Sequence, residues 1–93
     1  MHVNVRLFAR LRDIAGTGEL EREVPTDATV AVVWQTLVAE FQELDQYTKS
    51  ISSAVNTEYS KMNTVLNEDD EVAFLPPVSG GSSLGSGMTT NYW

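Results

Sequence analysis

Residues 30–41 read Val-Ala-Val-Val-Trp-Gln-Thr-Leu-Val-Ala-Glu-Phe, and this stretch decides the fold. Its large apolar residues recur three or four positions apart, the period of one helix face: Val30, Val33, Trp34, Leu37, Val38 and Phe41. Thr29 is a suitable N-cap, and Asp27 adds negative charge near the helix start. A helix with one broad apolar stripe has to pack on a sheet, so we expect Trp34 and Phe41 in the core.

The residues before this helix predict two strands. Residues 2–7 alternate apolar and polar side chains, which is typical of a half-buried strand. Residues 9–15 predict a short helical turn that Gly16 ends. Residues 19–24 predict a second strand, ended by Pro25, with Arg22 facing inward between Leu20 and Val24. An inward charge and three glutamates favour an edge strand, since charge hinders unwanted edge pairing.

The residues after the helix predict three more strands. Residues 42–50 are polar and irregular in pattern. Residues 51–56 and 57–61 predict two short strands around a turn, and residues 71–75 predict a last strand after an acidic turn. The order β-β-α-β-β-β indicates an α+β fold, a β-grasp (ubiquitin-like) roll with one main helix across one face of a mixed sheet. In this fold the first and last strands lie side by side and parallel, and the C-terminus leaves from the centre of the sheet.

Length and charge exclude several classes of protein. The chain has 93 residues, a formal net charge of −7 and no cysteine. The absence of cysteine excludes disulfides and thiolate chemistry, and the acidic balance argues against nucleic-acid binding and favours a partner with a basic docking surface. The apolar runs are too short to span a membrane, and residue 1 is not followed by a secretory signal pattern, so we expect a cytoplasmic protein. We expect residues 1–78 to form one domain, residues 79–81 a functional tail and residues 82–93 a flexible Gly/Ser-rich extension.

The body offers little catalytic chemistry. His2 is the single histidine, and we expect it to be solvated. The acidic run 68–71 lacks the ligand spacing of a calcium loop and is expected to be a solvated turn, so no metal site is predicted. The serines and threonines have no histidine placed to activate them. Arg10 and Arg12 remain open between partner contacts and simple surface charges.

Residues 76–81, Pro-Pro-Val-Ser-Gly-Gly, follow the last predicted strand directly. The prolines end the strand because neither can donate a ladder hydrogen bond. The two glycines, without a Cβ, can enter a channel too narrow for a larger residue. A terminal glycine carboxylate is also unhindered to attack at its carbonyl. This arrangement predicts a chain end that another protein's pocket accepts.

Three blocks in the same order resemble the MoaD family, the small subunits of molybdopterin synthase among the MoaD/ThiS ubiquitin-like sulfur carriers. They are residues 5–16 (VRLFARLRDIAG), residues 54–56 (AVN) and residues 70–81 (DEVAFLPPVSGG). The closing block is the most specific of the three. The resemblance covers residues 1–81.

This resemblance implies a non-catalytic sulfur-carrier subunit of a sulfurtransferase. In the family, a MoeB-like activating enzyme adenylates the Gly-Gly terminus with ATP and zinc, and a persulfide donor converts the adenylate to a thiocarboxylate. The tail then enters the large subunit, MoaE, and the sulfur passes to the cyclic pyranopterin precursor of molybdenum cofactor. By position, Gly81 carries the thiocarboxylate and Gly80 threads the channel, and the chain itself binds no cofactor.

The same resemblance assigns partner binding to the exit segment, Pro76, Pro77, Val78 and Ser79. Phe8 and Phe74 are candidates for an apolar docking face, and a core position is equally open for each.

The chain departs from the family at two places. The family has glycine where Asp69 stands, in a tight turn that aspartate also tolerates. The family ends at its second glycine, whereas this sequence continues through residues 82–93, which leaves Gly81 without a carboxylate. Three explanations are open: a protease removes the extension, the extension is a linker, or it disables the carrier and leaves a binding module.

Two other functions also remain open. The chain could carry sulfur for thiamin or for thiolated tRNA, because related carriers share part of the closing block. It could instead be a ubiquitin-like modifier joined to lysines through Gly81.

Overall fold

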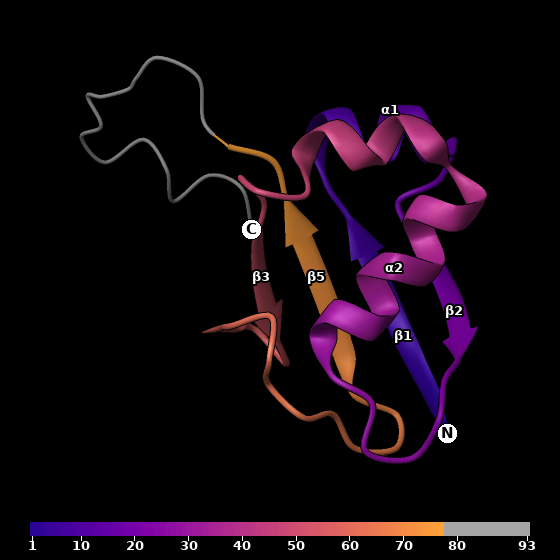
Figure 1. The fold of residues 1–93 in the computed structure, drawn as a ribbon, viewed down its shortest axis with the longest axis vertical. Helices are drawn as coiled ribbons and strands as arrows, with labels where there is room; N and C mark the ends of the chain where they lie inside the picture. Colours follow the sequence, from indigo (N-terminus) through magenta and orange to yellow (C-terminus); the bar gives the residue numbers. More distant parts are fainter. Residues whose placement is uncertain (78–93) are drawn as a thin grey trace.

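The computed structural model describes residues 1–77, which build a mixed five-stranded sheet with helices on one side (Figure 1). The strands are β1 (His2–Leu7), β2 (Glu19–Glu23), β3 (Ser52–Val55), β4 (Glu58–Ser60) and β5 (Glu71–Leu75). Their order across the sheet is β2-β1-β5-β3-β4. The helices are α1 (Ala9–Ala15), α2 (Val30–Glu40) and the 3₁₀-helix η1 (Gln42–Tyr47).

The first and last strands are adjacent and parallel, from the pair Asn4–Glu71 to the pair Leu7–Phe74. The other neighbouring pairs are antiparallel. Helix α2 lies across one face of the sheet in Figure 1, within the crossover that joins these two parallel strands. This arrangement confirms the predicted β-grasp roll. Among the described residues, none of the helices has the length and apolar character needed to cross a membrane.

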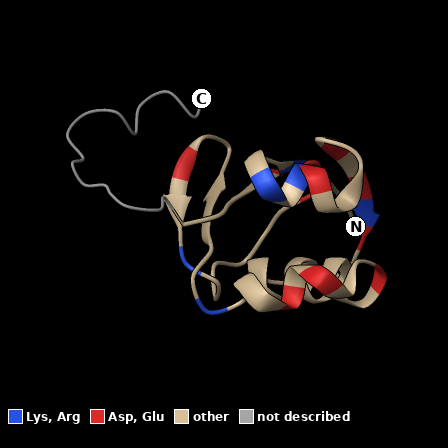
Figure 2. Cartoon of the chain, turned by 90° about the horizontal axis from the view of Figure 1, so that it is seen from above, with Lys and Arg blue, Asp and Glu red and all other residues tan. Residues whose placement is uncertain are grey.

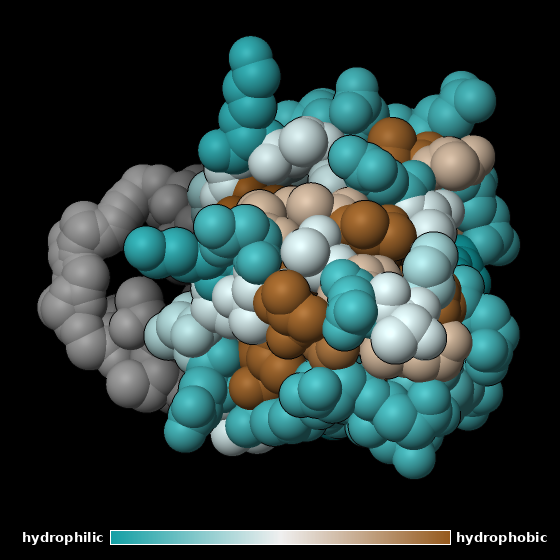
Figure 3. Space-filling model, turned by 60° about the horizontal axis from the view of Figure 1, so that its bottom comes forward, coloured by the Kyte–Doolittle hydropathy of each residue, from teal (hydrophilic) through white to brown (hydrophobic). Residues whose placement is uncertain are grey.

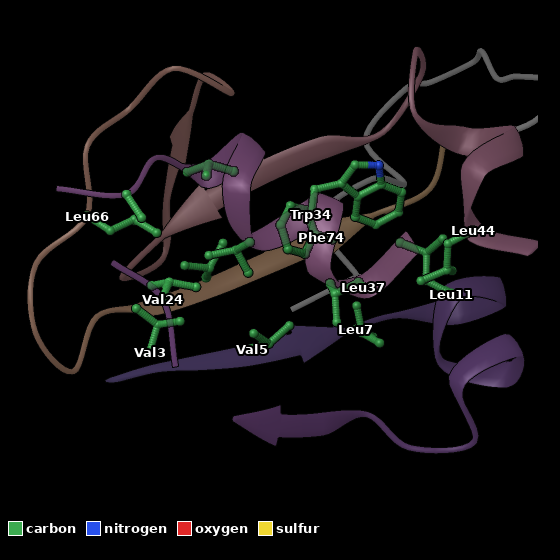
Figure 4. Close-up of a cluster of buried hydrophobic side chains, with 14 residues drawn as sticks. Val3, Val5, Leu7, Leu11, Val24, Trp34, Leu37, Leu44, Leu66 and Phe74 are labelled. Carbon is green, nitrogen blue, oxygen red and sulfur yellow. The ribbon is translucent and has the colours of Figure 1, made fainter. Parts of the chain in front are cut away.

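The core lies between α2 and the sheet (Figure 4). Trp34 is 1% exposed, and its ring centroid lies 5.0 Å from that of Phe74, with the rings tilted by 51°. Leu11 from α1 and Leu44 from η1 close one end of this cluster, and Val3, Val24 and Leu66 close the other. Burial of a large apolar side chain contributes roughly 1.5–3 kcal/mol to folding stability. The buried apolar face of α2 therefore holds the helix against the sheet.

Strand β2 forms one edge of the sheet, as its charges predicted. Arg22 is opposite the buried Val3, on the side of the sheet that faces α2. Its guanidinium forms an ion pair with Glu40 at the end of α2. The inward charge therefore has a partner from the helix.

The structure differs from the sequence prediction at residues 42–50. Residues 42–47 form η1, and Leu44 within it is completely buried. Phe41 is only partly buried and caps the end of α2. The indole N–H of Trp34 donates a 2.9 Å hydrogen bond to Thr48 Oγ1. This bond supplies a partner for the polar atom of a buried ring.

His2 is also placed differently from the expectation that it would be simply solvated. Its Nε2 lies 3.0 Å from Glu21 Oε1 on β2, and its Nδ1 lies 3.0 Å from Asp69 Oδ1 in the turn before β5. These hydrogen bonds, the one to Glu21 foremost and then the one to Asp69, raise the pKa of His2 above its ordinary value of 6.5. Protonated His2 therefore joins three segments at the end of the sheet where β1 begins.

Stability should depend on pH through His2. Because the folded-state pKa is raised, the stabilisation is fully present below the unfolded pKa and is lost as pH rises through the folded value. We expect the difference in unfolding free energy between the natural chain and His2→Gln to be larger at about pH 6 than at about pH 8.5. Urea titrations at both pH values measure it, and a difference that is constant or grows with pH contradicts this assignment.

The turn between β3 and β4 is strained. Asn56 and Thr57 both have positive φ angles, 51° and 73°, as a two-residue hairpin turn requires. Asparagine tolerates this region, but a β-branched residue rarely adopts it. Glycine is the residue that such a turn favours at its second position.

We therefore expect Thr57→Gly to increase the unfolding free energy by about 1 kcal/mol, because relief of strain exceeds the extra chain entropy of glycine. The control is Thr26→Gly, at an exposed threonine whose φ is not positive. This variant should lose about 0.5 kcal/mol of unfolding free energy. Chemical denaturation measures the unfolding free energy of both variants, and an equal loss of stability in the two would contradict the strain assigned to Thr57.

Candidate functional site

Strand β5 is the strand that leads to the predicted tail, and it lies between β1 and β3. Its last four residues, Val72, Ala73, Phe74 and Leu75, are at most 5% exposed. Both of its edges carry a ladder of backbone hydrogen bonds. The end of the strand is therefore held in a fixed place on the molecule.

The start of β5 is fixed by the side chain of Asn56. Its Nδ2 donates a 3.0 Å hydrogen bond to Asp70 Oδ1, and its Oδ1 accepts one of 3.0 Å from the backbone N–H of Glu71. Its backbone N–H donates to the Glu71 carbonyl at 2.8 Å. The hairpin turn thus sets the register in which β5 enters the sheet.

Asp69 lies two residues before the start of β5 and has a φ of 65°. This left-handed backbone favours glycine, and aspartate is among the residues that tolerate it. Its backbone N–H donates a 2.7 Å hydrogen bond to the His2 carbonyl. The departure at this position leaves the turn intact.

The exit from β5 lies at the end of the sheet where β1 also ends, next to the first residue of β3. Leu75 pairs with Ser52, and α1 contacts β5 near this end. Pro76 is partly buried and Pro77 exposed, and they leave the sheet at the upper end of β5 in Figure 1. Of the predicted site residues, Val78, Ser79, Gly80 and Gly81 lie outside the described residues.

The two phenylalanines occupy different environments. Phe74 is completely buried against Trp34, so of the two roles left open for it the structure shows the core position. Phe8 is partly exposed just after β1, and the Arg6 guanidinium carbon lies 5.6 Å from the centre of its ring. Phe8 therefore lies near the exit end of the sheet, and Phe74 lies in the core.

Of the remaining residues with reactive groups, the serines at the start of β3 lie beside the exit, whereas His2 is distant from it. His2 begins β1 and lies at the opposite end of the sheet from Leu75. The buried Ser53 hydroxyl donates to the Ser60 carbonyl at 3.1 Å. The role of Asn56 was not anticipated from the sequence, although a two-residue Asn-Thr turn between two strands was a signal for it.

The topology and the central, buried last strand define a ubiquitin-like β-grasp protein. Residues 5–81 match the model of the ThiS family, and the chain belongs to that family. The molybdopterin synthase sulfur carrier subunit of Arabidopsis thaliana is 32% identical over 81 residues, which cover 87% of this chain and 84% of the relative.

Two solved structures extend the comparison. The chain is similar to SAMP1 of Haloferax volcanii, with a TM-score of 0.78 and 29% identity over 87% of this chain and 100% of SAMP1. It is also similar in fold to a chain in the complex of subunits 1 and 2 of the molybdopterin-converting factor from Helicobacter pylori. That match has a TM-score of 0.61 and 23% identity and covers 87% of this chain and 100% of the other.

The Asn56 contacts give a test of how the terminal strand is held. Asn56→Ala should lower the unfolding free energy by at least about 1 kcal/mol, because it leaves the Glu71 N–H without its side-chain acceptor and places alanine at a φ of 51°. The amide hydrogens of β5 should also exchange faster than in the natural chain. Asn63→Ala, at an exposed asparagine, is the control and should change neither quantity. Unchanged exchange in Asn56→Ala contradicts the role given to this side chain.

Proposed function

We propose that this chain is the sulfur-carrier subunit of molybdopterin synthase and that it carries sulfur on Gly81 as a thiocarboxylate. The supporting observation is the placement of β5, the buried central strand whose end at Leu75 is separated from Gly80-Gly81 by four residues. The name of the Arabidopsis relative supports the same role. Because the chain has no cysteine, its activated sulfur has to be carried on a terminus.

The chemistry requires a free Gly81 carboxylate, so the bond from Gly81 to Ser82 has to be cleaved first. A carboxylate oxygen then attacks the α-phosphate of ATP on an activating enzyme, which forms an acyl-adenylate and releases pyrophosphate. The outer sulfur of a persulfide displaces AMP from the carbonyl carbon. The product is an acyl disulfide between Gly81 and the donor. A second thiol of the donor then attacks the donor's own sulfur, which forms a disulfide within the donor, breaks the S–S bond to Gly81 and leaves the thiocarboxylate there. Adenylation supplies the leaving group that a carboxylate lacks.

The proposed partners are a large subunit, which accepts the tail, and the adenylating enzyme. The similarity in fold to a chain of the Helicobacter pylori complex of subunits 1 and 2 supports the first of these. Pro76 and Pro77 stiffen the start of the tail, and the glycines allow its end to enter a narrow channel. The chain itself contributes no catalytic group and binds no cofactor in this scheme, and ATP is consumed on the activating enzyme.

The decisive experiment compares two forms of the chain. A form that ends at Gly81 and the form with all 93 residues are each incubated with activating enzyme, ATP and a persulfide donor. We expect the first form to gain the mass difference between sulfur and oxygen. The second form should not change, because its Gly81 carbonyl belongs to a peptide bond. Absence of the mass change in both forms, with a known carrier active in the same assay, rejects the proposal.

A second function, as a ubiquitin-like protein modifier, is supported by the similarity to SAMP1 of Haloferax volcanii. Another matching structure, at a TM-score of 0.73, gives the full name of that protein as small archaeal modifier protein 1. In that case Gly81 would be joined to lysines of target proteins. Digests of cell extracts would then contain Gly-Gly remnants on lysines that disappear when this gene is deleted. Rescue of a cofactor-deficient strain separates the molybdopterin role from sulfur transfer to thiamin or tRNA.

A further inference from the structure

The face of the sheet opposite α2 has no helix on it in the described part of the chain. The half of this face formed by β2, β1 and the start of β5 is acidic. The paired positions bring Glu19, Glu21 and Glu71 around Asn4 and Arg6. Figure 3 shows a different surface, the end of the sheet where β1 begins, which is largely polar with small separate hydrophobic patches.

These residues line a shallow hollow of about 290 Å³, which we call the β2 hollow; it is lined by Asn4, Arg6, Glu19, Glu21 and Glu71, with Val5 and Leu20 beneath. At about 30 Å³ for each water, it has room for a long side chain. The side chains of Glu19 and Glu21 are 75% and 71% exposed at its rim. An entering group therefore meets carboxylate oxygens first.

The positive groups in the β2 hollow are too few for its carboxylates. Arg6 Nη1 lies 3.4 Å from Glu71 Oε2, and its Nε lies 3.7 Å from Glu19 Oε2, so one guanidinium serves two carboxylates at long range. The contact of Arg6 Nε with Glu19 is an ion pair without a hydrogen bond, so it neutralises that exposed carboxylate only weakly. Only His2, at 3.0 Å from Glu21 Oε1, adds a further charge when it is protonated. The hollow keeps an excess of negative charge within a chain of net charge −7.

The geometry points to a docking surface: we infer that the β2 hollow receives a lysine or arginine side chain from the protein that accepts the tail. This inference rests on the proposed function, and it identifies the chemistry of the partner surface. The hollow lies on β2 and β1 and includes Glu71 at the start of β5, the strand from whose other end the tail leaves. One rigid sheet thus presents the tail at its end and a negative site on its open face. Charge complementarity of this kind mainly increases the rate of association.

The experiment uses the mature chain from its own cells and the large subunit of the same organism, with association followed by stopped flow. Glu19→Gln combined with Glu21→Gln should slow association about tenfold at low salt. The difference should shrink as salt shortens the screening length. Glu43→Gln combined with Glu58→Gln is the matched control, since it removes the same charge from exposed residues outside the hollow, on η1 and β4. It should change the rate less than twofold.

Thermal melts of both double variants check that the fold is kept, which we expect because exposed ion pairs contribute little to stability. The salt dependence of the natural chain is a second measurement that needs no variant, and its association rate should fall as salt rises. Equal rates for the two double variants, or a natural rate independent of salt, overturn the docking surface and leave the proposed function standing. If the natural chain forms no complex with the large subunit, both the docking surface and the proposed function are rejected.

Discussion

The parallel ladder between β1 and β5 is the constraint on which the rest of the molecule depends. It places the last strand in the middle of the sheet, where β3 holds its other edge. The strand is buried almost completely, so it cannot shift without opening the core. Figure 1 shows the consequence, since the chain leaves the sheet at one defined point. A carrier that has to present its terminus to different proteins needs such a fixed exit.

Side chains distant in sequence support this ladder at the other end. Asn56 fixes the first residue of β5, and His2 links β1 to the turn before it. Asp69 and Thr57 adopt left-handed backbone conformations in the two turns that surround this entry. The structure therefore accepts strained turns where the register of the terminal strand is set.

Figure 2 shows that charge is unevenly distributed over the chain, with acidic residues on the helices and strands in excess of basic ones. Most of the ion pairs in the described part join β1 or β2 to another segment, as Arg6 and Arg22 do. Exposed pairs of this kind contribute only about 0–1 kcal/mol each. On the open face, Arg6 neutralises only part of the charge of Glu19 and Glu71, so this face stays negative and suits a partner with basic groups.

The sequence predicted the elements whose side chains repeat with a clear period. The alternation of residues 2–7 and the stripe from Val30 to Phe41 led to the correct topology. Residues 42–47 were missed because Leu44 is a lone buried residue in a polar segment without a period. The two roles open for Phe74 could not be resolved, since β5 is buried on both faces and shows no alternation. The partners of His2 are 19 and 67 positions away in sequence, and only the fold brings them together.

In the proposed function, the sheet serves to present a free glycine end. Intact-mass measurement of the protein purified from its own cells tests this most directly, because it shows where the mature chain ends and which atom ends it. The account predicts a chain that terminates at Gly81, part of it with sulfur in place of one carboxylate oxygen. A mature chain that keeps all of residues 82–93, in cells that make molybdenum cofactor through it, would contradict the account.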